Sequence, residues 1–360
     1  MAQAQTGGRW VGLDGLRGLA SFAVVIHHSL ILGTDIGGLS VFLFFILSGF
    51  LITGILHRSR EKIEAGRARL LPALEDFWVR RALRIFPAYY LWLGVFVVLD
   101  VTFRDGEILK DLWWYLVYLQ NVLIGFVSYR WGDFTHVWSL AVEQQYYVFF
   151  APLVVLVPTR WHTRLIVATI ALCLVAIVTL AAFGYEMVTL YTAPVTGFVF
   201  MGAGALMTLE RARTPAWIGS WPSLVVAMAV IVALACYPIA EREHILRLSY
   251  VVLVVASVTS LSVVMIHVLD HPDSPVTRVL ETRPLKFLGL ISYGLYVIHL
   301  PVGVFMERWL PLDAWAAATH LPRNVVDFVV MSVLSIGLAS ASWFWFEAKI
   351  LALKDRFQRL

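Results

Sequence analysis

LDGLRGLASFAVVIHHSLIL, residues 13–32, has the composition of a membrane helix but includes Asp14, Arg17, His27 and His28. Ionisable side chains in a membrane segment are costly and usually face a protein interior or a water-filled cavity. Arg17 and His28 are eleven residues apart, about three turns of a helix, so both side chains lie on one helix face. They are separated by ~16 Å along the axis, about half the thickness of the hydrocarbon core. The segment therefore predicts a polar track that runs from one membrane surface toward the bilayer interior.

The composition of the whole chain is that of a polytopic membrane protein. Of its 360 residues, 60% are hydrophobic and 14% are charged, whereas soluble proteins have about 25% charged residues. The net charge of +4 is explained by basic cytoplasmic loops, so we expect no nucleic-acid partner. Cys173 and Cys236 lie in apolar runs and are predicted to be packing residues rather than a disulfide or a metal pair. A cleaved signal peptide is disfavoured because His27 and His28 interrupt the first apolar segment.

Apolar runs long enough to cross a bilayer predict an all-α transmembrane helix bundle with about ten spanning helices. The runs are 13–33, 39–57, 85–103, 137–157, 164–183, 187–208, 221–240, 246–268, 287–309 and 324–347.

The run 108–127 is ambiguous, because its tryptophans and tyrosines suit a membrane interface. The arginine-rich loop over residues 58–84 is predicted to be cytoplasmic. If 108–127 does not cross the membrane, the later basic loops and the C-terminal tail also lie in the cytoplasm. If it does cross, all of them lie outside. We therefore expect both termini in the cytoplasm. The run 108–127 is then an interfacial or re-entrant segment at the outer face.

Glu143 lies in the run WSLAVEQQYYVFF, residues 138–150. It is predicted to lie at the same depth as His28, each about six residues, or ~9 Å, from the outer end of its helix. A buried carboxylate can orient an imidazole, set its tautomer and raise its basicity. Such a pair could remove a proton from a hydroxyl as a general base. The alternative is a structural hydrogen-bonded pair that fixes helix packing.

FWVRRALRIFPAYY, residues 77–90, places Arg80, Arg81 and Arg84 at the predicted cytoplasmic end of the third helix. Arg80 and Arg84 share a helix face by their i, i+4 spacing. Guanidinium groups bind phosphates with two parallel hydrogen bonds, so this cluster is a candidate phosphate site. The alternative is that these arginines only anchor the helix on the cytoplasmic side.

Two further apolar runs contain polar groups. FFILSGFLIT, residues 44–53, includes Ser48 and Gly49, small residues that favour close helix contact. A nucleophilic role of Ser48 is disfavoured because the run lacks a preceding strand and the G-x-S-x-G pattern. ISYGLYVIHLPV, residues 291–302, includes Tyr293 and His299. For His299, a buried hydrogen-bonded histidine and a place along the polar track are equally supported.

Five motifs, taken together and in order, resemble those of the integral-membrane acyltransferase-3 family. They are LDGLRGLASFAVVIHH (13–28), GGLSVFLFFILSGFLIT (37–53), FWVRRALRIFPAYY (77–90), HVWSLAVEQQYYVFFAP (136–152) and LGLISYGLYVIHLPV (288–302). The likeness extends over residues 10–347. Its most specific parts are the Arg-to-His spacing of the first motif and W-S-L-x-V-E-Q-x-Y.

The resemblance implies transfer of an acyl group, usually acetyl, from a cytoplasmic acyl-CoA to a hydroxyl of a sugar or related acceptor, commonly across the membrane. The histidine of the family's first motif matches His28 rather than His27, and the arginine of that motif matches Arg17. The family's glutamate matches Glu143. Its arginine-rich motif matches Arg80, Arg81 and Arg84.

We therefore expect a single transmembrane acyltransferase domain over residues 1–360, with a core at 10–347 and a cytoplasmic tail at 348–360, in the cytoplasmic (inner) membrane of a bacterium. Acetyl-CoA or another acyl-CoA would bind with its phosphates at the arginines. His28, oriented by Glu143, would either deprotonate the acceptor hydroxyl or take the acyl group itself, and the sequence leaves both mechanisms open. The expected partners are membrane lipids, acyl-CoA and a carbohydrate or glycosylated acceptor, with no metal.

The polar track leads from Arg17 toward the catalytic pair. The side chains predicted along it are Asp14, Ser48, Trp138, Ser139, Tyr293 and His299. The rival class is a transporter or flippase for a sugar- or lipid-linked substrate, which would have a polar track without covalent chemistry. Inverted repeats would favour that class, but the first-helix motif does not recur in the second half. Some members carry a hydrolase-like domain after the membrane part. The sequence up to Leu360 has none, so transfer by such a domain is not expected.

Overall fold

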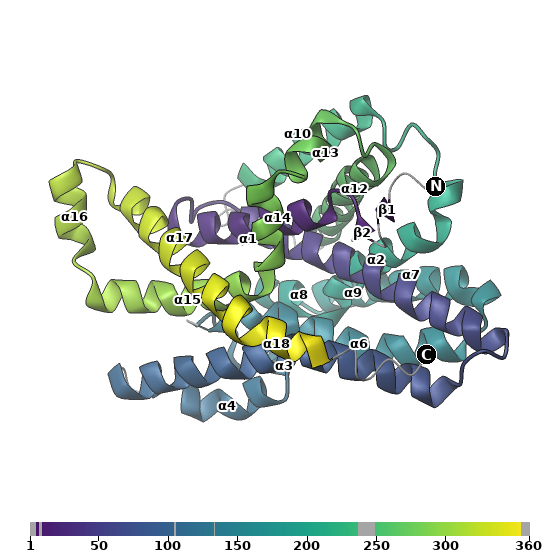
Figure 1. Ribbon diagram of the computed structural model, residues 1–360, viewed down its shortest axis with the longest axis horizontal. Coiled ribbons are helices and arrows are strands. Elements are labelled where there is room, and N and C mark those ends of the chain that lie inside the picture. The colour runs from purple at the N-terminus through teal and green to yellow at the C-terminus, as the bar shows by residue number, and fades with distance from the viewer. Residues whose placement is uncertain (1–4, 7–8, 104–105, 133, 237–248, 354–360) are drawn as a thin grey trace. The chain divides into compact units, whose positions relative to one another are not determined.

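The protein is built almost entirely from helices (Figure 1). The computed structural model describes residues 5–6, 9–103, 106–132, 134–236 and 249–353. The only strands in this part of the chain form one short antiparallel pair, β1 (Gln5–Thr6) and β2 (Arg9–Trp10). The predicted all-α class is therefore confirmed.

Seven helical stretches in the described part of the chain are long and apolar enough to cross a membrane, so the chain is an integral membrane protein. They are Ile36–Glu64 (α2), Leu70–Phe103 (α3), Thr135–Leu156 with α6 (Trp138–Leu156), Thr159–Ala182 with α7 (His162–Ala182), Met187–Arg213 with α8 (Met187–Thr192) and α9 (Pro194–Glu210), Ser249–Asp270 (α12), and Arg323–Leu351 with α17 (Arg323–Ser342). The helices α14 (Arg283–Leu290) and α15 (Ser292–Trp309) add an eighth crossing if the pair, bent by 75°, is one span.

In the described residues, fewer helices are long enough to cross a bilayer than the predicted number of about ten. Helix α1 (Leu13–Ser29) has 17 residues and α10 (Trp221–Cys236) has 16, fewer than the ~20 that usually cross a bilayer. Helix α1 ends before residue 33 because the chain turns there, with Thr34 Oγ1 donating to Ile31 O at 2.9 Å. The end of the predicted run 221–240 lies outside the described residues.

The segment 108–127 is not a continuous helix, and it is not among the stretches that could span, as the sequence predicts. It consists of α4 (Ile108–Leu116), α5 (Gln120–Val122) and the start of a π-helical turn, η2 (Leu123–Ser128). The chain turns at Tyr118, whose φ of 56° is uncommon for a residue other than glycine. Gln145 Nε2 of α6 donates to Tyr118 O at 3.1 Å. Irregular backbone is tolerated at membrane depth where other parts of the protein satisfy its polar groups, as Gln145 does here.

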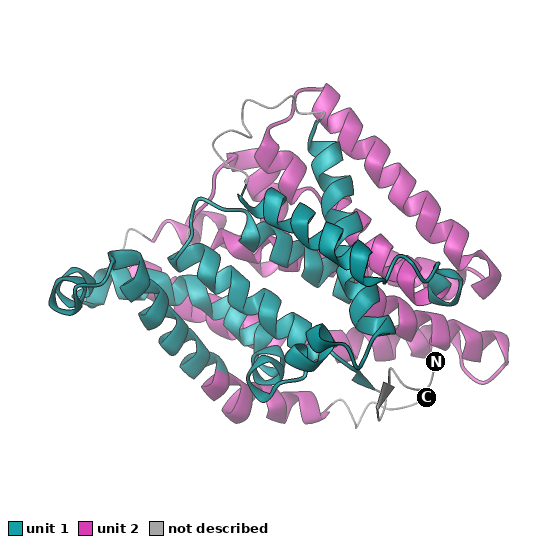
Figure 2. Cartoon of the chain, turned by 90° about the horizontal axis from the view of Figure 1, so that it is seen from above, with its two compact units in different colours: residues 1–47, 210–339 teal, residues 48–209, 340–360 magenta. Residues whose placement is uncertain are grey.

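The chain folds as two compact units (Figure 2). Unit 1 comprises residues 1–47 and 210–339, and unit 2 comprises residues 48–209 and 340–360. In unit 1, α1 packs against α13 (Pro275–Leu280), α14 and α15. In unit 2, α6 packs against α3, α5 and α8.

Two glycines bring α1 close to its neighbours in unit 1. A Cβ on Gly15 would lie 1.8 Å from Leu280 O, and a Cβ on Gly289 of α14 would lie 1.9 Å from Asp14 O. Both distances are far inside van der Waals contact, so a larger residue would force the backbones apart. The DGLRG run therefore packs backbone to backbone, and this fixes the direction in which Arg17 points.

Helices α2 and α9 approach equally closely in unit 2. A Cβ on Gly49 would lie 1.9 Å from Met201 O, and Thr208 Oγ1 donates to Phe50 O at 2.7 Å. The predicted role of Ser48 and Gly49 in close helix contact is thus confirmed for Gly49, whereas Ser48 has a polar partner.

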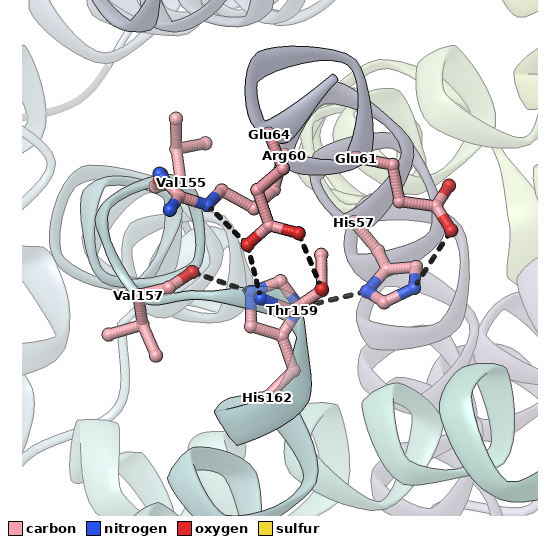
Figure 3. Close-up of polar contacts among 8 residues, drawn as sticks. All are labelled: His57, Arg60, Glu61, Glu64, Val155, Val157, Thr159 and His162. Atoms are coloured by element: carbon pink, nitrogen blue, oxygen red, sulfur yellow. Dashed lines mark hydrogen bonds and ion pairs between the residues drawn. The ribbon is translucent and has the colours of Figure 1, made fainter. Parts of the chain in front are cut away.

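A polar cluster at the end of α2 fastens this helix to the connection between α6 and α7 (Figure 3). His57 Nδ1 lies 2.8 Å from His162 Nδ1. Glu64 accepts hydrogen bonds from the backbone N–H of Thr159 at 2.9 Å and from its hydroxyl at 2.7 Å. A carboxylate at the start of a helical segment satisfies N–H groups that have no partner within the helix. The cluster thereby holds α2 against the end of α6. The same two helices also meet at Ser48 of α2 and Glu143 of α6.

Candidate active site

Arg17 and His28 both face α15, as their eleven-residue spacing predicts. Arg17 Nη2 lies 3.4 Å from Ser292 Oγ, and the ring centroids of His28 and His299 are 5.2 Å apart. Ser292 and His299 are seven residues apart, about two turns, so they share one face of α15. Two facing rows of polar side chains therefore run along the contact between α1 and α15 in unit 1.

His27 points to a different neighbour. A Cβ on Gly37, at the start of α2, would lie 2.6 Å from His27 Cδ2, so the His27 ring lies directly against this glycine. The rings of His27 and His28 are 4.7 Å apart and nearly perpendicular, at 73°. Adjacent residues on a helix point ~100° apart, and here only His28 contacts the α15 row.

The sequence left two readings of His299, a buried hydrogen-bonded residue or a member of the polar track, and its position fits both. Its side chain is fully buried, and Nδ1 lies 2.7 Å from Tyr296 O. Because a carbonyl oxygen only accepts, Nδ1 carries the proton, and in the neutral ring Nε2 keeps its lone pair. The same ring lies beside His28. His299 is thus a hydrogen-bonded core residue and also a neighbour of the predicted catalytic histidine.

The remaining residues predicted along the track in unit 1 lie near the beginnings of α1 and α15. Asp14 Oδ2 pairs with Arg9 Nε at 2.5 Å. Both side chains are well exposed, so the pair contributes little to stability. Tyr293 follows Ser292 and is half-buried.

Glu143 of α6 is the centre of a polar network in unit 2. The hydroxyls of Ser48 (α2) and Tyr147 (α6) both donate to Glu143 Oε1. The guanidinium carbon of Arg81 (α3) lies 6.0 Å from the centre of the Tyr147 ring and 5.9 Å from that of Phe77. Three helices therefore contribute to one site, and its carboxylate is held by two neutral donors beside a cation.

Tyr147 is the residue of this network that the sequence reasoning missed. It is buried, with 3% of its surface exposed. The available signal was its position four residues after Glu143, which places both side chains on one face of α6. That signal alone does not separate Tyr147 from the other aromatic residues that pack along the same helix.

The three arginines of the predicted phosphate site do not point the same way. Arg80 pairs with Asp76 one turn earlier, at 2.8 Å. Arg84 is exposed, whereas Arg81 stacks on Tyr147 inside the unit. Glu347 is buried, accepts a hydrogen bond from Ser342 Oγ at 2.7 Å, and lies close enough to Arg84 for their charges to interact.

Trp138 and Ser139 lie at the start of α6 and are both buried. The Trp138 ring is 5.0 Å from the ring of Tyr191. In the described part of the chain, no group of three or more His, Cys, Asp or Glu residues could hold a metal ion. Cys173 is buried, as expected of a packing residue, whereas Cys236 is exposed.

Each unit brings together some of the predicted site residues. Arg17, His28 and His299 form a row in unit 1, and Ser48, Glu143 and Arg81 form a network in unit 2. Because His28 and Glu143 belong to different units, their pairing stays a prediction. An imidazole suits proton transfer or acyl transfer, and a hydrogen-bonded carboxylate suits orientation of an imidazole.

Comparison with known proteins gives a consistent result over most of the chain. A family profile described as an acyltransferase domain matches residues 10–344. O-acetyltransferase OatA of Staphylococcus aureus (strain NCTC 8325 / PS 47) is 28% identical over 326 residues, covering 83% of this chain and 51% of the relative. Peptidoglycan O-acetyltransferase OatA of Listeria monocytogenes serovar 1/2a is 28% identical over 322 residues, covering 81% of this chain and 49% of the relative.

A third relative is named as a putative peptidoglycan O-acetyltransferase, YrhL of Bacillus subtilis (strain 168). It is 28% identical over 317 residues, covering 81% of this chain and 48% of the relative. The chain therefore spans about half the length of the curated relatives it matches. No solved structure is significantly similar to it.

Proposed function

The chain belongs to the acyltransferase-3 family, a family of membrane acyltransferase domains, and from this premise we propose that it transfers an acetyl group from cytoplasmic acetyl-CoA to a hydroxyl of a cell-envelope glycan. The observation that carries the proposal is the row formed by Arg17 and His28 along α15. It places a guanidinium and an imidazole on one face of a helix in an apolar chain. A transporter would need a polar track too, but the family to which this chain belongs performs acyl transfer.

The chemistry requires the acceptor hydroxyl to lose a proton and the thioester to be cleaved. In direct transfer, His28 takes the proton of the hydroxyl while its oxygen forms a bond to the acetyl carbon. The carbon–sulfur bond then breaks, and the proton passes to the CoA thiolate. In the covalent alternative, a nitrogen of the His28 imidazole forms a bond to the acetyl carbon, the carbon–sulfur bond breaks, and the imidazole proton passes to the CoA thiolate. The acceptor oxygen then bonds to the acetyl carbon, the carbon–nitrogen bond breaks, and the hydroxyl proton returns to the imidazole. Both routes consume one acetyl-CoA and release one free thiol for each ester formed.

The acceptor is proposed to be peptidoglycan or a related glycan. Two of the relatives carry peptidoglycan in their names, and a glycan presents many hydroxyls of similar reactivity. Specificity would then depend on positioning rather than on activation of one unusual group.

The donor is proposed to bind through its phosphates at Arg80, Arg81 and Arg84. We expect replacement of all three by glutamine to weaken binding of acetyl-CoA at least tenfold, because each charge-assisted hydrogen bond contributes about 1.5–3 kcal/mol. Titration of purified protein with acetyl-CoA measures this directly. The matched control is Arg9→Gln, which removes an exposed arginine on another element. Unchanged affinity in the triple variant would leave these arginines as topology anchors.

The orientation follows from the distribution of basic residues. We propose that both termini and the loop 58–84 are cytoplasmic and that 108–127 does not cross. In a Cys236→Ser background, cysteines placed beside Arg160 and Arg211 should react only with reagents that reach the cytoplasmic side. Cys173 is buried in the structure and serves as the internal control. Labelling of either new cysteine from outside alone would contradict this orientation.

A further inference from the structure

We infer that Tyr147 is a positioning residue that holds Glu143 and Arg81 in one arrangement, so that Arg81 acts with the glutamate whereas Arg80 and Arg84 act on the acyl donor. This inference rests on the proposed acetyl transfer and divides the arginine cluster into two functions. The two functions of the arginines are inferred from the contacts of Tyr147, which touches Glu143 on its own helix, α6, and Arg81 on α3.

The first contact fixes the carboxylate. Ser48 and Tyr147 both donate to Glu143 Oε1, and neither bond uses Oε2. An ionised carboxylate only accepts hydrogen bonds, and each of its oxygens can accept more than one. Two donors on one oxygen stop rotation of the group and leave the other oxygen for a different partner. In the proposed reaction, that partner is the imidazole N–H of the catalytic histidine or the acceptor hydroxyl.

The second set of contacts ties the same tyrosine to α3. The rings of Tyr147 and Phe77 meet edge to face, with centroids 5.9 Å apart and planes at 89°. Trp78 Nε1 donates to Tyr147 O at 3.2 Å, and the Arg81 guanidinium lies over the Tyr147 ring at 6.0 Å. One turn of α3 therefore packs against α6 at Tyr147.

The direction of Arg81 separates it from the other two arginines. Arg80 and Arg84 are four residues apart and share a face, while Arg81 is turned ~100° from Arg80. Arg80 pairs with Asp76 and Arg84 is exposed. The Arg81 guanidinium instead lies over the ring of Tyr147, whose hydroxyl donates to Glu143. A cation stacked on an aromatic ring inside a protein is stabilised by the ring.

These contacts predict distinct kinetic roles. Loss of the Tyr147 hydroxyl frees one side of Glu143 Oε1, so the carboxylate can rotate away from its partner. That change affects the reaction step rather than the binding of acetyl-CoA. Loss of Arg81 should act in the same way, because its charge and its stacking serve the same carboxylate. Loss of Arg84 should instead weaken donor binding.

The test is a kinetic comparison of single variants of the full chain with acetyl-CoA and soluble peptidoglycan fragments. Tyr147→Phe keeps the ring on Phe77 and Arg81 and removes only the hydroxyl. We expect its kcat to fall about tenfold or more, with KM for acetyl-CoA changed less than about twofold. Arg81→Gln should show the same split, and Arg84→Gln should raise KM for acetyl-CoA. The double variant Tyr147→Phe/Arg81→Gln should lose less than the product of the two single losses, because both act through Glu143.

Two controls separate positioning from general loosening of the fold. Tyr146→Phe removes a neighbouring buried hydroxyl from a ring that stacks on Phe150 instead, and its kcat should stay near wild type. Glu64→Gln weakens the contact between α2 and the α6–α7 connection. It should lower the unfolding temperature without lowering kcat. A loss of kcat in Glu64→Gln as large as that in Tyr147→Phe would assign the effect to fold stability and overturn the inference.

The possible failures are distinguishable. Wild-type kcat in Tyr147→Phe, beside an active wild-type protein, would refute the positioning role and leave acetyl transfer standing. A raised KM with unchanged kcat in Arg81→Gln would return Arg81 to the donor site. Absence of acetyl transfer by the wild-type protein would instead refute the proposed function.

Discussion

His28→Ala is expected to abolish acetyl transfer, while His27→Ala keeps most of it. Only His28 lies in the row with Arg17 that faces α15, whereas the His27 ring lies against Gly37. Loss of a general base typically lowers the rate ~10²–10⁴-fold, and loss of a covalent acyl carrier could lower it further. The measurement is kcat for both variants at saturating acetyl-CoA, with amounts matched by expression and by thermal unfolding.

The two histidines provide their own matched control. They are adjacent, carry the same side chain and are both half-buried, so nonspecific damage to α1 should affect both variants alike. A dead His27→Ala beside an active His28→Ala would reverse the assignment. Equal activity of His28→Ala and the wild type would remove the base from the mechanism.

Glu143→Gln is the second change with a large expected effect. The amide has the shape of the carboxylate but lacks its charge, so it cannot stabilise a protonated imidazole in the same way. Loss of a carboxylate that orients a catalytic histidine lowers kcat by up to ~10⁴-fold in serine proteases, and we expect a decrease of about 10²–10⁴-fold here. Binding of acetyl-CoA should change little, because Glu143 accepts hydrogen bonds from two hydroxyls and the nearby Arg81 is the arginine that we assign to the glutamate rather than to the donor.

The control for this prediction is Glu75→Gln, which removes an exposed carboxylate from α3. Its kcat and unfolding temperature should match those of the wild type. If Glu143→Gln keeps wild-type kcat and only lowers the unfolding temperature, Glu143 is a structural hydrogen-bonded residue. This was the alternative that the sequence left open.

The features that the sequence predicted correctly depend on local geometry. The eleven-residue spacing of Arg17 and His28 determines a shared helix face wherever the helix is placed. The distribution of basic residues in the loops argued against a spanning helix at 108–127, and the structure breaks that segment at Tyr118. The close approach at Gly49 was likewise predictable, because small residues mark places where helices meet.

The features that the sequence did not predict depend on which helices pack together. Nothing in the residues from 77 to 90 indicates that Arg81, rather than Arg80, stacks on a tyrosine of α6. The partner of Ser48 was missed for the same reason, because Glu143 is 95 residues away in the chain. The number of about ten spanning helices stays a prediction, since hydropathy does not show that α1 stops at Ser29 or that the chain bends at Ile291.

The decisive measurement is acetyl transfer by the purified protein. The protein, in lipid nanodiscs, is given acetyl-CoA and soluble peptidoglycan fragments, and two products are followed together: free CoA thiol, and fragments heavier by one acetyl group. We expect the wild type to form both in equal amounts and His28→Ala to form neither. This expectation would be contradicted by a folded wild-type protein that releases no thiol and acetylates no fragment, while the same protein in vesicles moves the fragments across the membrane unchanged.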